Sequence, residues 1–310
     1  MKKQVNNSNL DMLNKPNFLI VGPPKSGTSS LFHYLKQHPE VFVSRVKEPF
    51  YFTSEIMENI SKEDPMLKSI MNYAHFDKSQ YFKLFDDAKN EKWLGEASVN
   101  YLYYYKHAIP KIKKELGDIR IILILRNPIN RAFSNYNYQL TGQKLTFEES
   151  LEIENNRIMQ NFNSFWFYKE SGLYYDSVKA YIDAFSKVKI FFFDDLKNNP
   201  NDFMKDIFKF LDVETSFVPN TQIIHNKTFI VKHKWIRNII FLKKKIFLKN
   251  KFEYKLPVFL SSIIRRLFYS TKNKSKMNLK KKKYLINYYK DDVKKLSDNK
   301  ETSSIEELLQ

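Results

Sequence analysis

Residues 16–35 read PNFLIVGPPKSGTSSLFHYL, and this stretch decides the fold expected for the chain. Four consecutive apolar residues, Phe18 to Val21, predict a buried parallel strand, which ends at Gly22 and two prolines. The spacing of the apolar residues that follow predicts a helix directly after the loop. A helix that begins behind such a loop directs unpaired backbone N–H groups and the positive end of its dipole at one place. The stretch therefore predicts an anion site, and phosphate is the usual ligand of such a site.

The loop between the expected strand and helix differs from a magnesium-dependent nucleotide loop. A Walker A motif needs G-x-x-x-x-G-K-[ST]. Gly22 and Gly27 have that spacing, but Thr28 stands in the lysine position and the lysine lies inside the loop, as Lys25. No second stretch offers a convincing strand-terminal aspartate for magnesium. The loop is therefore expected to bind phosphate, and the sequence does not favour a P-loop kinase.

A second anion-binding pattern follows the clearest buried strand of the sequence, residues 120–125 (RIILIL). Arg126 stands at the end of this strand, and Ser134 lies near the start of the helix expected over residues 130–140. An arginine at a strand end and a serine one step into the next helix can converge on one anion. The alternative is that Arg126 pairs with a buried acid while Ser134 lies on a helix surface.

The loop from Pro24 to Leu31 resembles the 5′-phosphosulfate loop of sulfotransferases that use 3′-phosphoadenosine 5′-phosphosulfate (PAPS). Arg126 and Ser134, eight residues apart, are similar to the pattern that grips the 3′-phosphate in that family. The resemblance runs from about residue 16 to residue 297. It implies a single α/β domain with a largely parallel central sheet, helices on both faces and a P-loop-like phosphosulfate loop.

The resemblance places the cofactor on these two patterns and on a later basic loop. The implied cofactor-binding residues are Lys25, Ser26, Gly27, Thr28, Ser29, Ser30, Arg126, Ser134 and Lys227. In the family, basic residues of a loop after the last helix close over the nucleotide. Lys227 is the candidate for such a residue here, with Lys232 and Lys234 as alternatives. PAPS is the implied sulfuryl donor, PAP is the product, and no metal is implied.

Sulfuryl transfer builds negative charge on the bridging oxygen of the leaving group, by analogy with phosphoryl transfer. A cation at that oxygen stabilises the transition state more than the ground state. Lys25 lies in the loop that would hold the 5′-phosphosulfate, so it is the candidate for this catalytic role.

The acceptor must lose a proton, and Glu48 is the candidate base. Residues 47–52 (KEPFYF) follow a second expected strand, at the sheet edge where ligands bind in open α/β folds. A carboxylate beside a proline and an aromatic run is partly desolvated, which makes it a better proton acceptor. Carbohydrate-modifying members of the family have a glutamate at this position, so the resemblance favours a sugar hydroxyl. The alternative is that Glu48 only pairs with Lys47 or Arg45.

Three further residues are candidates for substrate binding: Lys47, Glu96 and Tyr174. Tyr174 is expected to contact the adenosine or the acceptor, with core packing as the alternative. The three tyrosines at 103–105 form a candidate substrate wall, with helix packing as the alternative. Phe50 and Ala97 stand where some glycosaminoglycan-modifying relatives have a histidine and a lysine, which weakens an assignment to heparan-like acceptors.

The 310 residues are enough for one large α/β domain, and the absence of cysteine excludes disulfides, thiolate zinc sites and cysteine nucleophiles. We expect a flexible leader over residues 1–15, the sulfotransferase-like domain over 16–297 and a tail over 298–310. The leader lacks an apolar signal core and no apolar run is long enough to span a bilayer, so a cytoplasmic location is expected.

The net charge of +18 is concentrated in residues 231–283, which hold 18 lysines and arginines and a single acid, Glu253. We expect this basic subregion to be helical, because apolar and basic residues alternate along it. A helix packed on the domain with its lysines in water is the first interpretation. Peripheral contact with an anionic membrane and a groove for an acidic polysaccharide are the alternatives.

Three functions follow from these patterns. The first is transfer of a sulfuryl group from PAPS to a hydroxyl or amine of a carbohydrate or glycolipid. The second is a P-loop kinase, against which Thr28 argues. The third is a basic nucleic-acid-binding protein, which the net charge favours. The location of that charge outside the phosphate loop, and the lack of a known binding module, argue against it.

Overall fold

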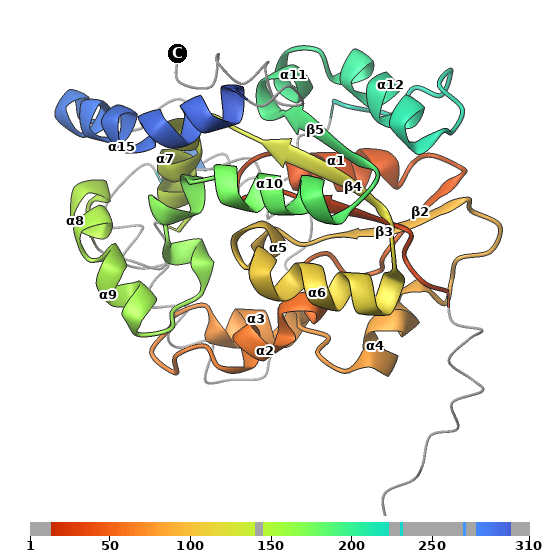
Figure 1. Ribbon diagram of the computed structural model, residues 1–310, viewed down its shortest axis with the longest axis horizontal. Coiled ribbons are helices and arrows are strands. Elements are labelled where there is room, and N and C mark those ends of the chain that lie inside the picture. The colour runs from red at the N-terminus through yellow and green to blue at the C-terminus, as the bar shows by residue number, and fades with distance from the viewer. Residues whose placement is uncertain (1–13, 140–144, 223–229, 232–268, 271–276, 299–310) are drawn as a thin grey trace, which may run out of the picture.

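The computed structural model describes residues 14–139, 145–222, 230–231, 269–270 and 277–298. Its centre is a five-stranded sheet in the order β2-β3-β1-β4-β5, with every neighbouring pair parallel (Figure 1). The strands are β1 (Phe18–Val21), β2 (Val41–Val43), β3 (Trp93–Ala97), β4 (Arg120–Leu125) and β5 (Val188–Phe192). The two strands predicted from apolar runs, residues 18–21 and 120–125, are thus the centre of the sheet.

The strands are joined by helices that lie on the two faces of the sheet. In chain order they are α1 (Thr28–Leu35), α2 (Ser54–Glu58), α3 (Leu67–Tyr73), α4 (Lys78–Phe82), α5 (Asn100–Tyr103), α6 (Tyr105–Leu116), α7 (Pro128–Gln139), α8 (Phe147–Glu152), α9 (Glu154–Met159), α10 (Tyr175–Ala184), α11 (Phe193–Asn198), α12 (Pro200–Leu211) and α15 (Leu279–Ser297). Short 3₁₀ helices are η2 (Tyr51–Thr53), η3 (Lys83–Phe85), η5 (Ser164–Trp166) and η6 (Glu170–Gly172).

Alternate residues of the central strands belong to two separate apolar cores. Phe18 and Ile20 of β1 pack in one core with residues of α1 and α12. Leu19 and Val21 pack in the other core with residues of α5, α6, α10 and α15. Successive side chains of a strand point to opposite faces, so a strand buried on both sides has no polar face. The expected α/β fold with helices on both faces of a parallel sheet is confirmed.

Five strands end at one edge of the sheet, where the loops after β1, β2, β3 and β4 meet. The loop after β1 packs directly on β4: a Cβ atom at Gly22 would lie 2.4 Å from the carbonyl oxygen of Ile124. Only glycine allows this approach. Ligands of open parallel sheets bind outside the carboxyl ends of the strands, so this edge is the place to look for a site.

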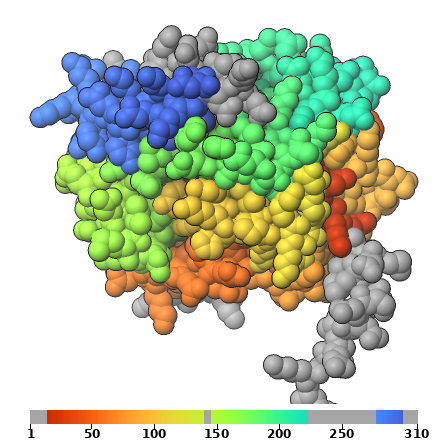
Figure 2. Space-filling model, in the orientation of Figure 1, coloured from red at the N-terminus to blue at the C-terminus, as the bar shows by residue number. Residues whose placement is uncertain are grey.

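The long helix α15 closes the described part of the chain. It packs against α7 and α10 (Figures 1 and 2). The carboxylate of Asp292 on α15 accepts hydrogen bonds from the backbone N–H groups of Tyr174 (2.8 Å) and Tyr175 (3.2 Å). A carboxylate at this position stabilises the N-terminus of α10, because it accepts from N–H groups that have no partner within the helix.

The leader and the tail lie almost entirely outside the described residues, and so does most of the basic subregion 231–283. At the start of the subregion and again within it the chain is extended, since β6 (Ile230–Val231) pairs antiparallel with β7 (Tyr269–Ser270), whereas residues 279–283 begin the helix α15. The expectation of helix is therefore wrong at the strand residues of this subregion. Among the described residues, no helix combines the length and the apolar character needed to span a membrane.

Candidate active site

The loop after β1 has a backbone conformation that few sequences adopt. Lys25 and Gly27 have positive φ angles of 74° and 98°. The hydroxyl of Ser26 donates a hydrogen bond to the carbonyl oxygen of Pro23 at 2.8 Å and closes the turn. A Cβ atom at Gly27 would lie 2.9 Å from side chains of α11, so the loop is also confined from outside. Ser26 and Gly27, predicted to bind the cofactor, set the shape of the loop.

The helix α1 starts directly behind this loop, as predicted. It begins at Thr28, has no acid in its first turn, and receives no side-chain cap from Gly27. Thr28, Ser29 and Ser30 form that first turn and are buried. The positive end of the helix dipole and the N–H groups of this turn therefore face the inside of the loop, which is the arrangement that binds phosphate.

Three cationic side chains lie close together here: Lys25 of the loop itself, Arg126 and Lys47. Burial, and after it the charges of Arg126 and Lys47, together lower the pKa of Lys25 from 10.5 to about 8. Arg126 donates from Nη1 to the carbonyl oxygen of Lys25 at 2.8 Å. Its guanidinium also lies 4.2 Å from the ring centroid of Phe193 on α11. Positive charge is thus concentrated where the sequence predicted an anion.

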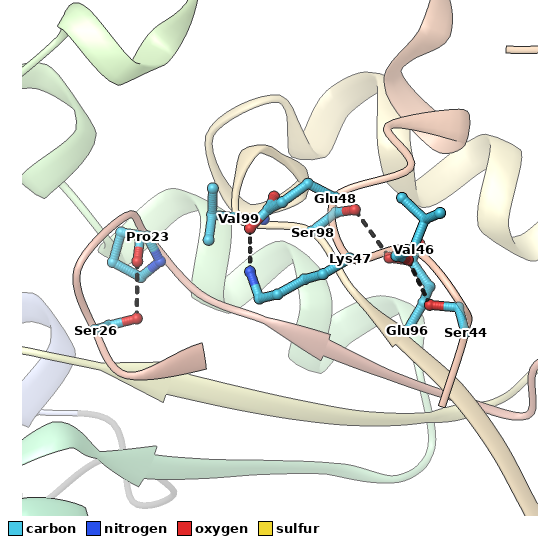
Figure 3. A network of polar contacts seen from close by, with 9 residues as sticks. All are labelled: Pro23, Ser26, Ser44, Val46, Lys47, Glu48, Glu96, Ser98 and Val99. Atoms are coloured by element: carbon cyan, nitrogen blue, oxygen red, sulfur yellow. Dashed lines mark hydrogen bonds and ion pairs between the residues drawn. The ribbon is translucent and has the colours of Figure 1, made fainter. Parts of the chain in front are cut away.

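Glu48 follows β2 and lies beside these cations. One carboxylate oxygen pairs with the ammonium of Lys47, and the other accepts a hydrogen bond from the N–H of Val99 at 2.9 Å (Figure 3). The positive φ angle of Glu48, 64°, lets the carboxylate turn back toward its neighbour in sequence. Glu48 thus pairs with Lys47, whereas Arg45 pairs with Asp87, and the role of Glu48 as a base stays a prediction.

Tyr138 is a residue of this site that the sequence did not single out. The ammonium of Lys25 lies 4.2 Å from the centroid of its ring, a favourable cation–π distance. Burial, and next the charge of Glu48, raise the pKa of Tyr138. Ser134 lies one helical turn earlier on α7 and is half-buried. Residues four apart share a helix face, so Ser134 lies on the side of α7 that Tyr138 turns toward the loop. The four-residue spacing between Ser134 and Tyr138 is the sequence pattern that could have pointed to Tyr138.

Glu96 and Tyr174, two candidates for substrate binding, are fully buried. Glu96 accepts hydrogen bonds from the hydroxyls of Ser98 (2.9 Å) and Tyr81 (3.4 Å). Burial, with a smaller contribution from the charge of Glu48, raises the pKa of Glu96 to about 7. The hydroxyl of Tyr174 donates to the carbonyl oxygen of Arg126 at 3.0 Å. Each side chain therefore supports a neighbouring residue and does not present surface to a ligand.

The remaining predicted residues fall into two groups. Lys47 is at the site, held by its ion pair with Glu48. Lys227, with the alternatives Lys232 and Lys234, lies outside the described residues. Across the part of the chain that the structure describes, no group of three histidine, aspartate or glutamate side chains could hold a metal ion.

The loop after β1, Arg126 at the end of the neighbouring strand β4 and Glu48 after β2 thus lie together at the carboxyl edge of the parallel sheet of an α/β protein. A family model described as the sulfotransferase domain matches residues 15–255. The chain therefore belongs to the sulfotransferase family.

Among curated relatives, the membrane-associated sulfotransferase kil1 of Dictyostelium discoideum is 31% identical over 137 residues, 44% of this chain and 26% of the relative. Human carbohydrate sulfotransferase 15 is 26% identical over 163 residues, 42% of this chain and 28% of the relative. The mouse bifunctional heparan sulfate N-deacetylase/N-sulfotransferase 4 is 32% identical over 127 residues, 40% and 13% of the two chains. The chain thus matches between 13% and 28% of the length of these relatives.

Solved structures agree on the fold. A sulfotransferase from Alicyclobacillus acidocaldarius has a TM-score of 0.71 at 29% identity, covering 92% of this chain and 96% of that one. Mouse sulfotransferase SULT7A1, solved in complex with PAP, has a TM-score of 0.50 at 14% identity, covering 97% and 91%.

Proposed function

We propose that this chain transfers a sulfuryl group from PAPS to a hydroxyl or amine of a carbohydrate or glycolipid, in a metal-independent, in-line step. The observation that supports it most is the cluster of Lys25, Lys47 and Arg126 at the N-terminus of α1, with Glu48 as the carboxylate that pairs with it. Three partly buried cations with one carboxylate leave an excess of positive charge. Burying that charge costs free energy unless an anionic ligand compensates it.

The cofactor would lie across the ends of β1 and β4. The loop from Lys25 to Ser30 would hold the 5′-phosphosulfate, and Arg126 with Ser134 would hold the 3′-phosphate. The hydrogen bond from Arg126 to the carbonyl of Lys25 supports this proposal, because it ties the two phosphate sites into one rigid unit.

In the reaction, a bond forms between the acceptor oxygen and sulfur while the bond from sulfur to the bridging oxygen breaks. The acceptor proton passes to Glu48, and PAP leaves with the electron pair. Lys25 would stabilise the charge that grows on the bridging oxygen. The Lys47 pair and the Val99 N–H hold the carboxylate of Glu48 in one orientation, which a general base needs.

The class of acceptor is supported by the relatives. Carbohydrate sulfotransferase 15 and the heparan sulfate N-sulfotransferase are named for carbohydrate substrates. The Dictyostelium relative is named as membrane-associated, which supports peripheral membrane contact through residues 231–283 as part of this proposal. Nucleic acid is not a proposed partner.

The test is calorimetric titration with PAP in EDTA, with ATP as the control ligand. We expect tight binding of PAP and weaker binding of ATP. Arg126→Ala should weaken PAP binding at least about tenfold, since a charge-assisted hydrogen bond contributes on the order of 1.5–3 kcal/mol. Arg45→Ala, which removes an exposed arginine paired with Asp87, is the matched control and should leave affinity unchanged. A folded protein that does not bind PAP would contradict the proposal.

A further inference from the structure

A cavity of about 360 Å³ is lined by residues of α5, α6 and α10, which pack against one another. It reaches from the start of the phosphate loop to the first turns of α6 and α10. Its volume is at the small end of the range for small-molecule sites. Residues that define it are Pro24, Val99, Tyr103, Tyr105, Glu170 and Asp176.

The cavity shares its wall with the candidate catalytic residues. Pro24 lines the cavity and directly precedes Lys25. Val99 also lines it, and the N–H of Val99 donates to the carboxylate of Glu48 at 2.9 Å. Two lining residues thus adjoin the candidate catalytic residues, Pro24 through the chain and Val99 through its hydrogen bond to Glu48. This is where an acceptor could bind with one end directed at the base.

Aromatic rings form much of the lining. The three consecutive tyrosines at 103–105 all contribute, together with Leu102 and Leu173. The rings of Tyr103 and Tyr104 meet edge to face, with centroids 4.9 Å apart. Rings held in this way offer flat apolar surface, on which the C–H face of a sugar ring packs while its hydroxyls remain free to bond.

The charged groups of the cavity decide between kinds of sugar. Two acids, Glu170 and Asp176, line it, against one lysine, Lys106, among its described residues. Glu170 and Tyr103 both line the cavity, and the charge of Glu170, next after burial, raises the pKa of that tyrosine. It also accepts a hydrogen bond from the hydroxyl of Tyr288 at 3.2 Å. Carboxylates accept hydrogen bonds from sugar hydroxyls but repel the carboxylates and sulfates of an anionic polysaccharide.

We propose that this cavity is the acceptor subsite and that it binds an uncharged sugar unit, stacked on Tyr103 and hydrogen-bonded to Glu170 and Asp176. This inference rests on the proposed function, and it selects neutral glycans or glycolipid headgroups over glycosaminoglycans.

The test is saturation-transfer NMR on the full chain with PAP bound, using methyl β-glycosides of glucose, galactose and N-acetylglucosamine. Aliphatic glycosides avoid an aromatic aglycone that would itself stack on tyrosine. We expect transfer to the ring C–H protons of at least one glycoside. Tyr103→Ala should remove most of it, and Tyr103→Phe should retain it. The signal from an N-acetylheparosan oligosaccharide, which carries uronates, should be at least threefold weaker.

Asp176 is exposed, so Asp176→Lys tests the charge without disturbing the core. This variant should strengthen the heparosan signal relative to the glycosides. Asp183→Lys, an exposed position on the same helix outside the cavity lining, is the control and should change neither signal. Bound PAP without transfer to any neutral glycoside, or transfer that survives Tyr103→Ala, overturns the subsite and leaves the proposed reaction standing. Absence of PAP binding overturns the reaction itself.

Discussion

The guanidinium of Arg126 donates a hydrogen bond to the backbone carbonyl of Lys25 across 101 residues of sequence, at 2.8 Å. The end of β4 therefore holds the conformation of the loop that follows β1. Tyr174 supports Arg126 in turn, since its hydroxyl donates to the carbonyl oxygen of that arginine. Two patterns that are separate in the sequence thus form one structural unit.

Replacement of the candidate base is the most direct test of chemistry. Glu48→Gln keeps the size of the side chain and its hydrogen bond from Val99, but removes proton acceptance. We expect kcat to fall about 10²–10⁴-fold, the usual contribution of general base catalysis. The dissociation constant of PAP should change less than twofold. Steady-state sulfation kinetics with PAP calorimetry measure both quantities.

The control for this variant is Glu55→Gln, at an exposed position on α2. It should leave kcat unchanged. A Glu48→Gln protein with full kcat would show that another group accepts the proton.

Affinity for PAP should depend on pH through Lys25. Its pKa of about 8 in the unliganded protein means that the ammonium is protonated at pH 7 and largely neutral at pH 9. Anion binding needs the charged form, so PAP affinity should fall about tenfold between pH 7 and pH 9, where the protonated fraction falls by that factor. Titrations at pH 7, 8 and 9 in matched ionic strength give the profile.

A Lys25→Met variant separates this effect from others. It should bind PAP weakly at pH 7 and show little further loss by pH 9. An equally steep profile in the variant would assign the titration to a different group.

Tyr138→Ala tests the ring that lies under Lys25. An exposed cation–π contact contributes about 0.5–1 kcal/mol, so we expect kcat/KM for PAPS to fall about twofold to fivefold. Tyr138→Phe keeps the ring and should retain activity. Tyr284→Ala removes another exposed tyrosine, on α15, and serves as the control. Equal losses in the Ala and Phe variants would point to the hydroxyl instead of the ring.

Glu96→Gln should change how stability depends on pH. The pKa of Glu96 in the folded state, about 7, is raised above its ordinary value of 4.5. The folded state therefore holds a proton that the unfolded state loses between those values, and this group lowers stability as pH rises from 4.5 to 7. The cost above pH 7 is on the order of 3 kcal/mol. The variant lacks this cost, so its Tm should exceed that of the parent at pH 8.5 more than at pH 5.

Thermal unfolding at the two pH values measures the difference. The exposed Glu63→Gln variant is the control and should show the parent's dependence. A Tm difference that does not change with pH would mean that Glu96 stays protonated throughout.

Much of the fold was predictable because local and global preferences agree. A short apolar run followed by a glycine-rich loop and a helix has one common structural solution, and residues 18–35 adopt it. The position of Arg126 at a strand end was also predictable, since RIILIL is apolar enough to mark the strand without ambiguity.

What the sequence could not show depends on tertiary burial. Glu96 and Tyr174 have side chains that suit a substrate site, but the packing of helices over β3 and α10 buries both completely. Tyr138 reaches Lys25 only because α7 lies against the phosphate loop. Glu48, which pairs with Lys47, has a left-handed backbone conformation, which sequence patterns do not reveal.

The hydrogen bond between Arg126 and Lys25 also has a consequence for folding. A contact between residues 101 apart in sequence costs more loop-closure entropy than a local contact, so we expect this hydrogen bond to form late in folding. Early folding species would therefore carry both phosphate-binding patterns without a working nucleotide site. Bound nucleotide would mark molecules that have completed folding, and it would shift the population toward them by mass action.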